Sequence, residues 1–183
     1  MNLKSSGAEA LLVAGTPKFA AQAIRKAHEL GWKPMILLNY PSSSVGATLK
    51  PAGLDVATGV IVGTITMDPV DSQWDQSEGM KNYRAFVDKY MPGIDLSETN
   101  YLFGYTQGLL LERLLKQCGD DLSRANIIKQ AANLTDLVLP MLLPGIKINT
   151  SPTDFYPIEQ EQLARFDGER WVLFGELYDA SKK

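Results

Sequence analysis

ALLVAGTPKFAAQAIRKAHELGWKPMILLN (residues 10–39) contains two short apolar runs on either side of a segment with helical periodicity. Runs of this kind, at 10–14 and 34–39, are typical of strands buried in a parallel sheet. Between them, small and apolar residues share one helical face and charged residues the other. Thr16 and Pro17 suit a helix start, and Gly31 a helix end. The stretch therefore predicts a right-handed strand–helix–strand unit of the α/β class.

The rest of the chain continues in short elements. We expect a loop at 40–53, a third strand at 58–66, an acidic crossing at 67–77, an amphipathic helix at 78–91, an apolar helix at 101–118, a further helix from 123 to about 134, and strands at 146–149 and 171–178. The helix at 101–118 is apolar nearly all round, which predicts that most of it is buried.

Composition limits the class of protein. The 183 residues carry a formal net charge of −3, and no cluster of Lys and Arg indicates nucleic acid or an anionic membrane as a partner. A single cysteine, Cys118, excludes an intrachain disulfide, which fits a cytosolic protein and equally a periplasmic one. The N-terminal residues do not resemble a secretory signal, so we expect no export signal in this chain.

Residues for catalysis, metal binding or cofactor binding do not form a recognisable set. His28 is the only histidine, so a zinc site or a Ser–His–Asp triad has little support, and we expect His28 on a helix surface. The carboxylates at 68, 71, 75 and 78 lack the calcium-loop pattern and predict a solvated loop. The turn at 14–18 does not match the dinucleotide fingerprint. We therefore expect a binding protein with no catalytic residue, no metal and no cofactor.

Candidate ligand contacts lie where the first two strands end. Thr16 and Pro17 open a helix whose free N–H groups favour an anion such as a carboxylate. Asn39 and Tyr40 follow the next strand, at the same sheet edge if the strands are parallel, and Tyr40 offers a stacking ring and a hydroxyl. Tyr105, in the aromatic entry to the apolar helix, is a further candidate for a wall of the ligand pocket. The structural alternatives to these binding roles are that Thr16 only caps the helix, that the Tyr40 ring packs down within its loop, and that Tyr105 is a core residue.

Several phrases, in this order, resemble one family. They are AGTPKFAAQAIRKAHELGWKP (14–34), TGVIV (58–62) with DPVDSQW (68–74), FGYTQGLLLERLLKQCG (103–119) and LLPGIKINTSPTDFYPIEQEQLARFDGERW (142–171). Their succession is similar to the type I periplasmic substrate-binding proteins of ABC transporters, the group of the Leu/Ile/Val-binding proteins. The resemblance covers nearly the whole chain but only the C-terminal part of such a receptor.

The resemblance implies a fold and a role. Residues 1–66 and 140–183 would form a second lobe with a three-layer parallel sheet, and 67–139 the hinge crossing and helices of the first lobe. The full-length protein would be periplasmic, bind an amino acid or an aromatic or other carboxylate, and deliver it to an ABC permease without chemistry. The family's contacts carry over to Thr16 and Tyr40. Because relatives that bind amino acids can have an acidic residue at position 40, Tyr40 favours an uncharged or aromatic ligand.

Other functions stay open from sequence. The absence of an export signal favours a cytosolic small-molecule sensor on the same fold. An enzyme is the remaining alternative, if Asp and Glu side chains pair in space as a general acid and base. The apolar faces at 78–91 and 101–118 predict either self-association into a homodimer or helices folded back onto the chain's own sheet.

Overall fold

The computed structural model describes residues 3–182 and contains a five-stranded sheet with the order β1-β2-β3-β4-β5. The strands are β1 (Ala10–Val13), β2 (Met35–Leu38), β3 (Ile61–Thr64), β4 (Gln160–Phe166) and β5 (Trp171–Asp179). The first three are parallel neighbours, which confirms the predicted strand–helix–strand unit. The remaining two pair antiparallel, so the sheet is mixed where a parallel sheet was predicted. A short turn between β4 and β5 leaves no crossover, and two strands joined in this way can only be antiparallel.

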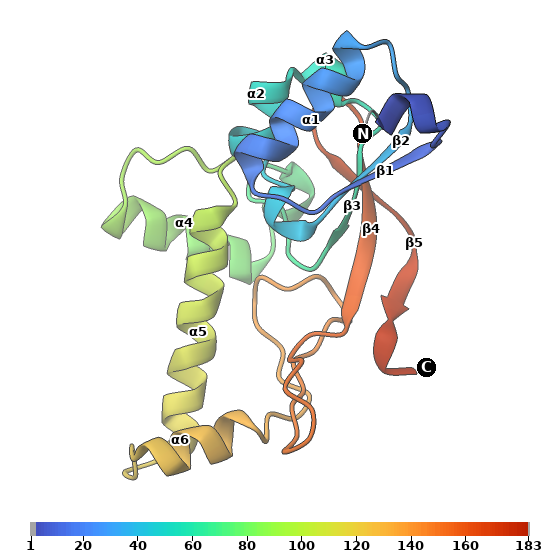
Figure 1. Ribbon diagram of the computed structural model, residues 1–183. Helices are drawn as coiled ribbons and strands as arrows, with labels where there is room; N and C mark the ends of the chain where they lie inside the picture. The colour runs from blue at the N-terminus through green and yellow to red at the C-terminus, as the bar shows by residue number, and fades with distance from the viewer. Residues whose placement is uncertain (1–2, 183) are drawn as a thin grey trace.

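Helices occupy the connections. They are α1 (Pro17–Glu29), α2 (Lys50–Ala52), α3 (Leu54–Ala57), α4 (Glu78–Tyr90), α5 (Asn100–Cys118) and α6 (Arg124–Ala131), with 3₁₀ turns at Leu3–Ser6, Tyr40–Ser42, Ser72–Trp74 and Ala180–Lys182 and a π-helical turn at Val45–Leu49. Figure 1 shows α1, α2 and α3 together on one side of the sheet, while α4, α5 and α6 extend away from it. The predicted loop at 40–53 is therefore largely helical, and Ser44 begins its π-helical turn by accepting a hydrogen bond from Ala47 N at 3.0 Å.

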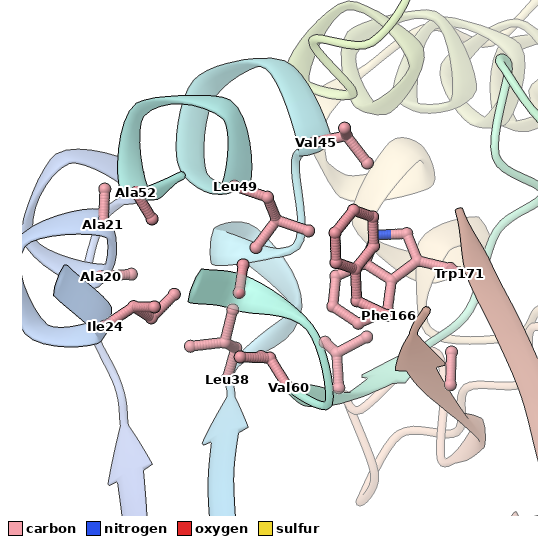
Figure 2. Close-up of a cluster of buried hydrophobic side chains, with 13 residues drawn as sticks. Ala20, Ala21, Ile24, Leu38, Val45, Leu49, Ala52, Val60, Phe166 and Trp171 are labelled. Atoms are coloured by element: carbon pink, nitrogen blue, oxygen red, sulfur yellow. The ribbon is translucent and has the colours of Figure 1, made fainter. Parts of the chain in front are cut away.

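The main core lies between the sheet and the helices that cover it. Figure 2 shows Ala20, Ile24 and Leu49 facing Leu38 of β2 and Val60, which directly precedes β3. Small side chains on α1 let the helix approach the sheet closely, as dense interior packing requires. At the far end of this core the rings of Phe166 and Trp171 meet edge to face, with centroids 5.6 Å apart.

The opposite face of the sheet is exposed toward its two edges in the described residues, although Ile61 of β3 is only 6% exposed there. The strand register places Leu12 and Val172 on that face, and they are 70% and 40% exposed. Leu11 and Val13 alternate with Leu12 and point toward α1. Residues 3–182 thus supply a helical layer on one face, where the prediction places a layer on each.

A second hydrophobic cluster lies beside the sheet. α4 contributes Met80, Tyr83 and Val87, as its predicted amphipathic pattern requires, and Met141 and Ile146 pack against them. Ser77 starts α4 by accepting a hydrogen bond from Met80 N at 3.2 Å.

The predicted lobe boundaries at 66 and 140 stay a prediction. Residues 141–143 both pair with the end of β3 and pack into this cluster.

Three sequence predictions fail outside the main core. The buried residues of α5 are Leu102, Thr106 and Cys118, and Phe103 is 47% exposed, so the prediction of a mostly buried helix is wrong. Only the N-terminal half of α5, as far as Leu110, reaches the second cluster. The predicted strand at 146–149 is a single bridge between Leu137 and Ile148, and β4 was not predicted at all.

No helix within residues 3–182 is long and apolar enough to cross a membrane. The homodimer stays a prediction.

Two glycines give a matched test of this packing. A Cβ on Gly79, in the first turn of α4, would lie 2.2 Å from the carbonyl oxygen of Pro140, whereas a Cβ on Gly104 in α5 would meet nothing within 4 Å. We expect Gly79→Ala to lower the free energy of unfolding by about 1–3 kcal/mol through overpacking. Gly104→Ala should raise it by about 0.5–1 kcal/mol, because alanine favours the helix. Urea denaturation measures both, and equal effects would contradict the packing of α4 on Pro140.

Candidate functional site

The carboxyl ends of β1 and β2 are joined by hydrogen bonds at one sheet edge. Asn39 N donates to Val13 O at 3.2 Å, and Gly15 N donates to the Asn39 Oδ1 at 3.4 Å. The Ser42 hydroxyl donates to Gly15 O at 2.7 Å. The turn that carries Thr16 is thereby fixed against the segment that carries Asn39 and Tyr40, as predicted from parallel strands.

Thr16 lies at the exposed start of α1. Its carbonyl oxygen accepts hydrogen bonds from Phe19 N and Ala20 N, both at 3.0 Å. Its side chain makes no capping hydrogen bond, so the hydroxyl is not engaged in the simple cap considered from sequence. Pro17 follows at the first helical position and is partly buried. The α1 start therefore presents a hydroxyl together with the positive end of a helix dipole.

Tyr40 points inward from this edge. Its hydroxyl lies 2.8 Å from the Thr66 Oγ1, just beyond the end of β3. Burial raises the pKa of Tyr40 above its usual value, an effect that the hydrogen bond with Thr66 opposes and the nearby Asp68 reinforces. The hydroxyl is therefore protonated at neutral pH and can donate a hydrogen bond.

Tyr40 separates two hollows. The first, called here the crossing cavity, has a free volume of about 30 Å³ and is lined in part by Tyr40, Thr66, Asp68, Asp71, Trp74 and Trp171. The second, called here the outer hollow, has a free volume of about 130 Å³ and is lined by Tyr40, Pro41, Thr99, Asn100 and Phe103. Thr99, like Tyr40, lines both hollows. The crossing cavity alone holds a group about the size of one or two water molecules.

Asp68 contributes a buried carboxylate to the crossing cavity. Its Oδ1 accepts a hydrogen bond from Val70 N at 3.0 Å. Its Oδ2 is buried and has no hydrogen-bond partner among residues 3–182. Burial raises the pKa of Asp68 and the charge of Asp71 adds to this, against the hydrogen bond from Val70. The fold therefore keeps this carboxylate in an environment that disfavours its charge.

Asp71 is buried but fully engaged. Its Oδ1 accepts hydrogen bonds from Gln73 N at 3.0 Å and from Arg170 Nη1 at 3.1 Å, and its Oδ2 accepts one from the Gln73 amide. The predicted solvated loop is thus wrong for this residue, which is 2% exposed. The reason is the β4–β5 turn, which brings Arg170 from 99 residues away. No signal in the acidic segment itself indicates that partner.

Tyr105 lies apart from Tyr40. Its ring packs against Tyr83 and Phe86, with centroids 5.1 and 5.0 Å away, in the second hydrophobic cluster. It lines neither the crossing cavity nor the outer hollow. The structure therefore unites Thr16, Pro17, Asn39 and Tyr40 at one edge and places Tyr105 elsewhere. Its role in ligand binding stays a prediction.

The remaining chemistry-bearing residues are isolated. His28 is exposed in the last turn of α1, and Cys118 is a free, buried thiol at the end of α5. Over the part of the chain that the structure describes, no group of three or more His, Cys, Asp or Glu side chains could hold a metal ion. Donors and acceptors also converge around Tyr40 and Asp68, beside the two hollows.

A family model described as periplasmic binding protein matches residues 2–170. The chain therefore belongs to the periplasmic binding protein family. Comparison with curated proteins gives no match.

Solved structures share the fold, as predicted. A Thermus thermophilus branched-chain amino acid ABC transporter protein with bound valine superposes with a TM-score of 0.76 at 16% identity, over 97% of this chain and 47% of that one. A possible leucine/isoleucine/valine-binding protein from Rhodopirellula baltica gives 0.73 at 18% identity, over 91% and 42%. A fatty acid ABC transporter substrate-binding protein from Thermomonospora curvata gives 0.67 at 17% identity, over 97% and 45%. This chain spans less than half the length of each.

Two aspartates of the crossing provide a test of the site's framework. We expect Asp71→Ala to lower the free energy of unfolding by about 2 kcal/mol, because a buried carboxylate that holds Arg170 and Gln73 is lost. Asp75 pairs with Arg84 at 2.7 Å, but 41% of its side chain is exposed. Asp75→Ala should therefore cost only about 0.2–1 kcal/mol. Chemical denaturation of both variants checks this, and a larger loss at Asp75 would contradict the assigned roles.

Proposed function

We propose that this chain is the solute-binding part of an ABC transporter receptor, which takes amino acids or small aromatic or other carboxylates. Membership of the periplasmic binding protein family supports a binding role. The observation that carries the proposal is the edge where Tyr40 and the α1 start meet, beside two hollows. Ligands of open α/β sheets occupy this edge, outside the carboxyl ends of the strands.

The two ends of the proposed site suit different parts of a solute. A carboxylate would lie against the α1 start, where the Thr16 hydroxyl and the positive end of the helix dipole attract an anion. An apolar body would lie on the ring of Tyr40 and along Phe103 in the outer hollow. In this proposal the site binds and releases its solute unchanged.

The setting of this function is also a proposal. The receptor that carries this chain would act in the periplasm and pass its solute to an ABC permease. The solved relatives include transporter proteins named for branched-chain amino acids and for fatty acids, so the fold is compatible with more than one solute class.

Substitution at Tyr40 tests the position of the site. In the receptor that carries this chain, we expect Tyr40→Ala to weaken solute binding by about 1–3 kcal/mol, through loss of a stacking ring and a hydroxyl. Thr16→Ala should cost about 1 kcal/mol. Tyr156, which is 77% exposed and lines neither hollow, provides the control substitution Tyr156→Ala. Isothermal titration with amino acids and aromatic carboxylates measures each affinity.

Tyr40→Phe separates binding from folding. This variant keeps the ring and loses only the hydrogen bond with Thr66, so it should fold even if Tyr40→Ala does not. An unchanged affinity in both folded Tyr40 variants would place the site elsewhere. Turnover of a substrate without binding of any of these solutes would contradict the transport role.

A further inference from the structure

The outer hollow lies between two segments that are far apart in the sequence. Tyr40 and Pro41 follow β2 and form one wall, whereas Thr99, Asn100 and Phe103 lie at the start of α5 and form the other. Within residues 3–182 no other segment lines this hollow. Its width is therefore the separation of these two walls.

The two segments are joined beside the hollow by a set of buried contacts, called here the Ser97 junction. The Ser97 carbonyl oxygen accepts hydrogen bonds from Gly46 N at 2.9 Å and from the Ser44 hydroxyl at 3.0 Å. Ser44 and Ser97 are 0% and 3% exposed. Because water cannot replace these bonds, breaking them would leave buried polar groups unpaired, which is costly.

Short, internally bonded turns connect the junction to both walls. On the side of the sheet, Ser43 N donates to Tyr40 O at 3.0 Å. On the side of α5, the Asp95 carboxylate accepts hydrogen bonds from Ser97 N at 2.9 Å and from the Ser97 hydroxyl at 2.7 Å, and Glu98 N donates to Asp95 O at 2.9 Å. The junction lies three residues beyond one wall and two residues before the other. A displacement at the junction is therefore passed on to the walls.

Gly46 shows how closely the two segments meet. A Cβ on Gly46 would lie 2.6 Å from the Ser97 hydroxyl oxygen and 3.0 Å from the Ser97 carbonyl carbon. The φ of Gly46 lies outside the left-handed region, so the obstacle to a side chain here is Ser97 and not the backbone conformation. Since the carbonyl carbon cannot rotate out of the way, alanine at this position must push the two segments apart.

The present separation of the walls leaves room for a small apolar group. The free volume of the outer hollow is about 130 Å³. A dry apolar cavity of about 150 Å³ holds one benzene molecule. A single ring or a branched aliphatic group therefore fits between the walls, and two fused rings need a wider gap.

We propose that the Ser97 junction fixes the width of the outer hollow and thereby limits the apolar part of the solute to a single ring or a branched aliphatic group. The inference rests on the proposed function, which places that part of the solute in this hollow, and adds a size limit to it. Ser97 and Gly46 act as positioning residues, since neither lines the hollow.

The test compares solutes that differ in the size of the aromatic group. Phenylacetate is paired with 1-naphthylacetate, and L-phenylalanine with 3-(1-naphthyl)-L-alanine, in isothermal titration with the receptor that carries this chain. We expect the smaller member of at least one pair to bind about tenfold more tightly, because the larger one overpacks the gap. Greater apolar area by itself would favour the larger member, so the opposite order indicates a size limit.

Variants of the junction should relax this preference. Gly46→Ala should reduce the affinity ratio within the pair about tenfold, because it parts the walls. Gly108→Ala makes the same substitution in α5, where a Cβ meets nothing within 4 Å, and should preserve the ratio. Ser44→Ala removes a buried donor without adding an atom, so it should fold even if Gly46→Ala does not, and should reduce the ratio about threefold to fivefold.

The ratio within a pair distinguishes positioning from a purely structural role. A junction that only stabilises the fold would lower both affinities by the same factor and leave the ratio unchanged. Equal affinity within both pairs, tighter binding of the larger members, or a ratio that survives in the folded junction variants overturns the size limit and leaves the solute-binding function standing. Absence of binding by every member of both pairs counts against the solute classes of the proposed function itself, and the size limit falls with it.

Discussion

The architecture depends on a backbone pairing just beyond the end of β3. Met67 N donates to Met141 O at 3.0 Å and Leu143 N donates to Ile65 O at 2.9 Å, on either side of a bridge between Thr66 and Leu142. This pairing carries the edge of the sheet into the second hydrophobic cluster. It fixes the direction in which the chain leaves β3, and therefore where Thr66 and Asp68 lie relative to Tyr40.

A second set of contacts joins the two clusters at the opposite end. Ser97, in the connection between α4 and α5, accepts hydrogen bonds at its carbonyl oxygen from Gly46 N at 2.9 Å and from the Ser44 hydroxyl at 3.0 Å. Lys50 donates to the Ser97 hydroxyl at 2.9 Å and pairs with Asp95 at 3.2 Å. The Lys50–Asp95 pair is exposed and contributes little by itself. The buried backbone bonds of Ser97 therefore dominate this junction, and Gly46 permits the close approach because a Cβ there would lie 2.6 Å from the Ser97 hydroxyl.

Sequence reasoning succeeded where one local rule determined the structure. The apolar runs and the 3.6-residue pattern between 10 and 39 predicted β1, α1 and β2, and strand-end geometry placed Thr16 beside Asn39. It failed where the partner of a segment lies far along the chain. The helix pattern of α5 was right, but burial depends on what the helix packs against, and only Leu102, Thr106 and Cys118 are buried. Asp68 and Asp71 looked like surface carboxylates for the same reason.

The sequence also carries a local signal for the hairpin of β4 and β5. Asp167-Gly168 follows the alternating segment that forms β4, and Asp-Gly between such segments is a strong hairpin signal. Reading it would have predicted the β4–β5 pair and the antiparallel part of the sheet. It would also have placed Arg170 and Trp171 together at a strand start. It would not have predicted that Arg170 reaches Asp71, since that contact depends on the three-dimensional position of the crossing.

The contact between Asp71 and Arg170 has a consequence for biosynthesis. The two residues are 99 positions apart, so a ribosome makes the acidic crossing long before it makes the cation that allows Asp71 to be buried. During that interval a hydrated carboxylate is more stable than a buried one without a partner. The nascent chain should therefore assemble its parallel strands first and hold the crossing open. The pocket beside Tyr40 then takes its final shape only after the hairpin has emerged and docked, so it is among the last parts of this chain to form.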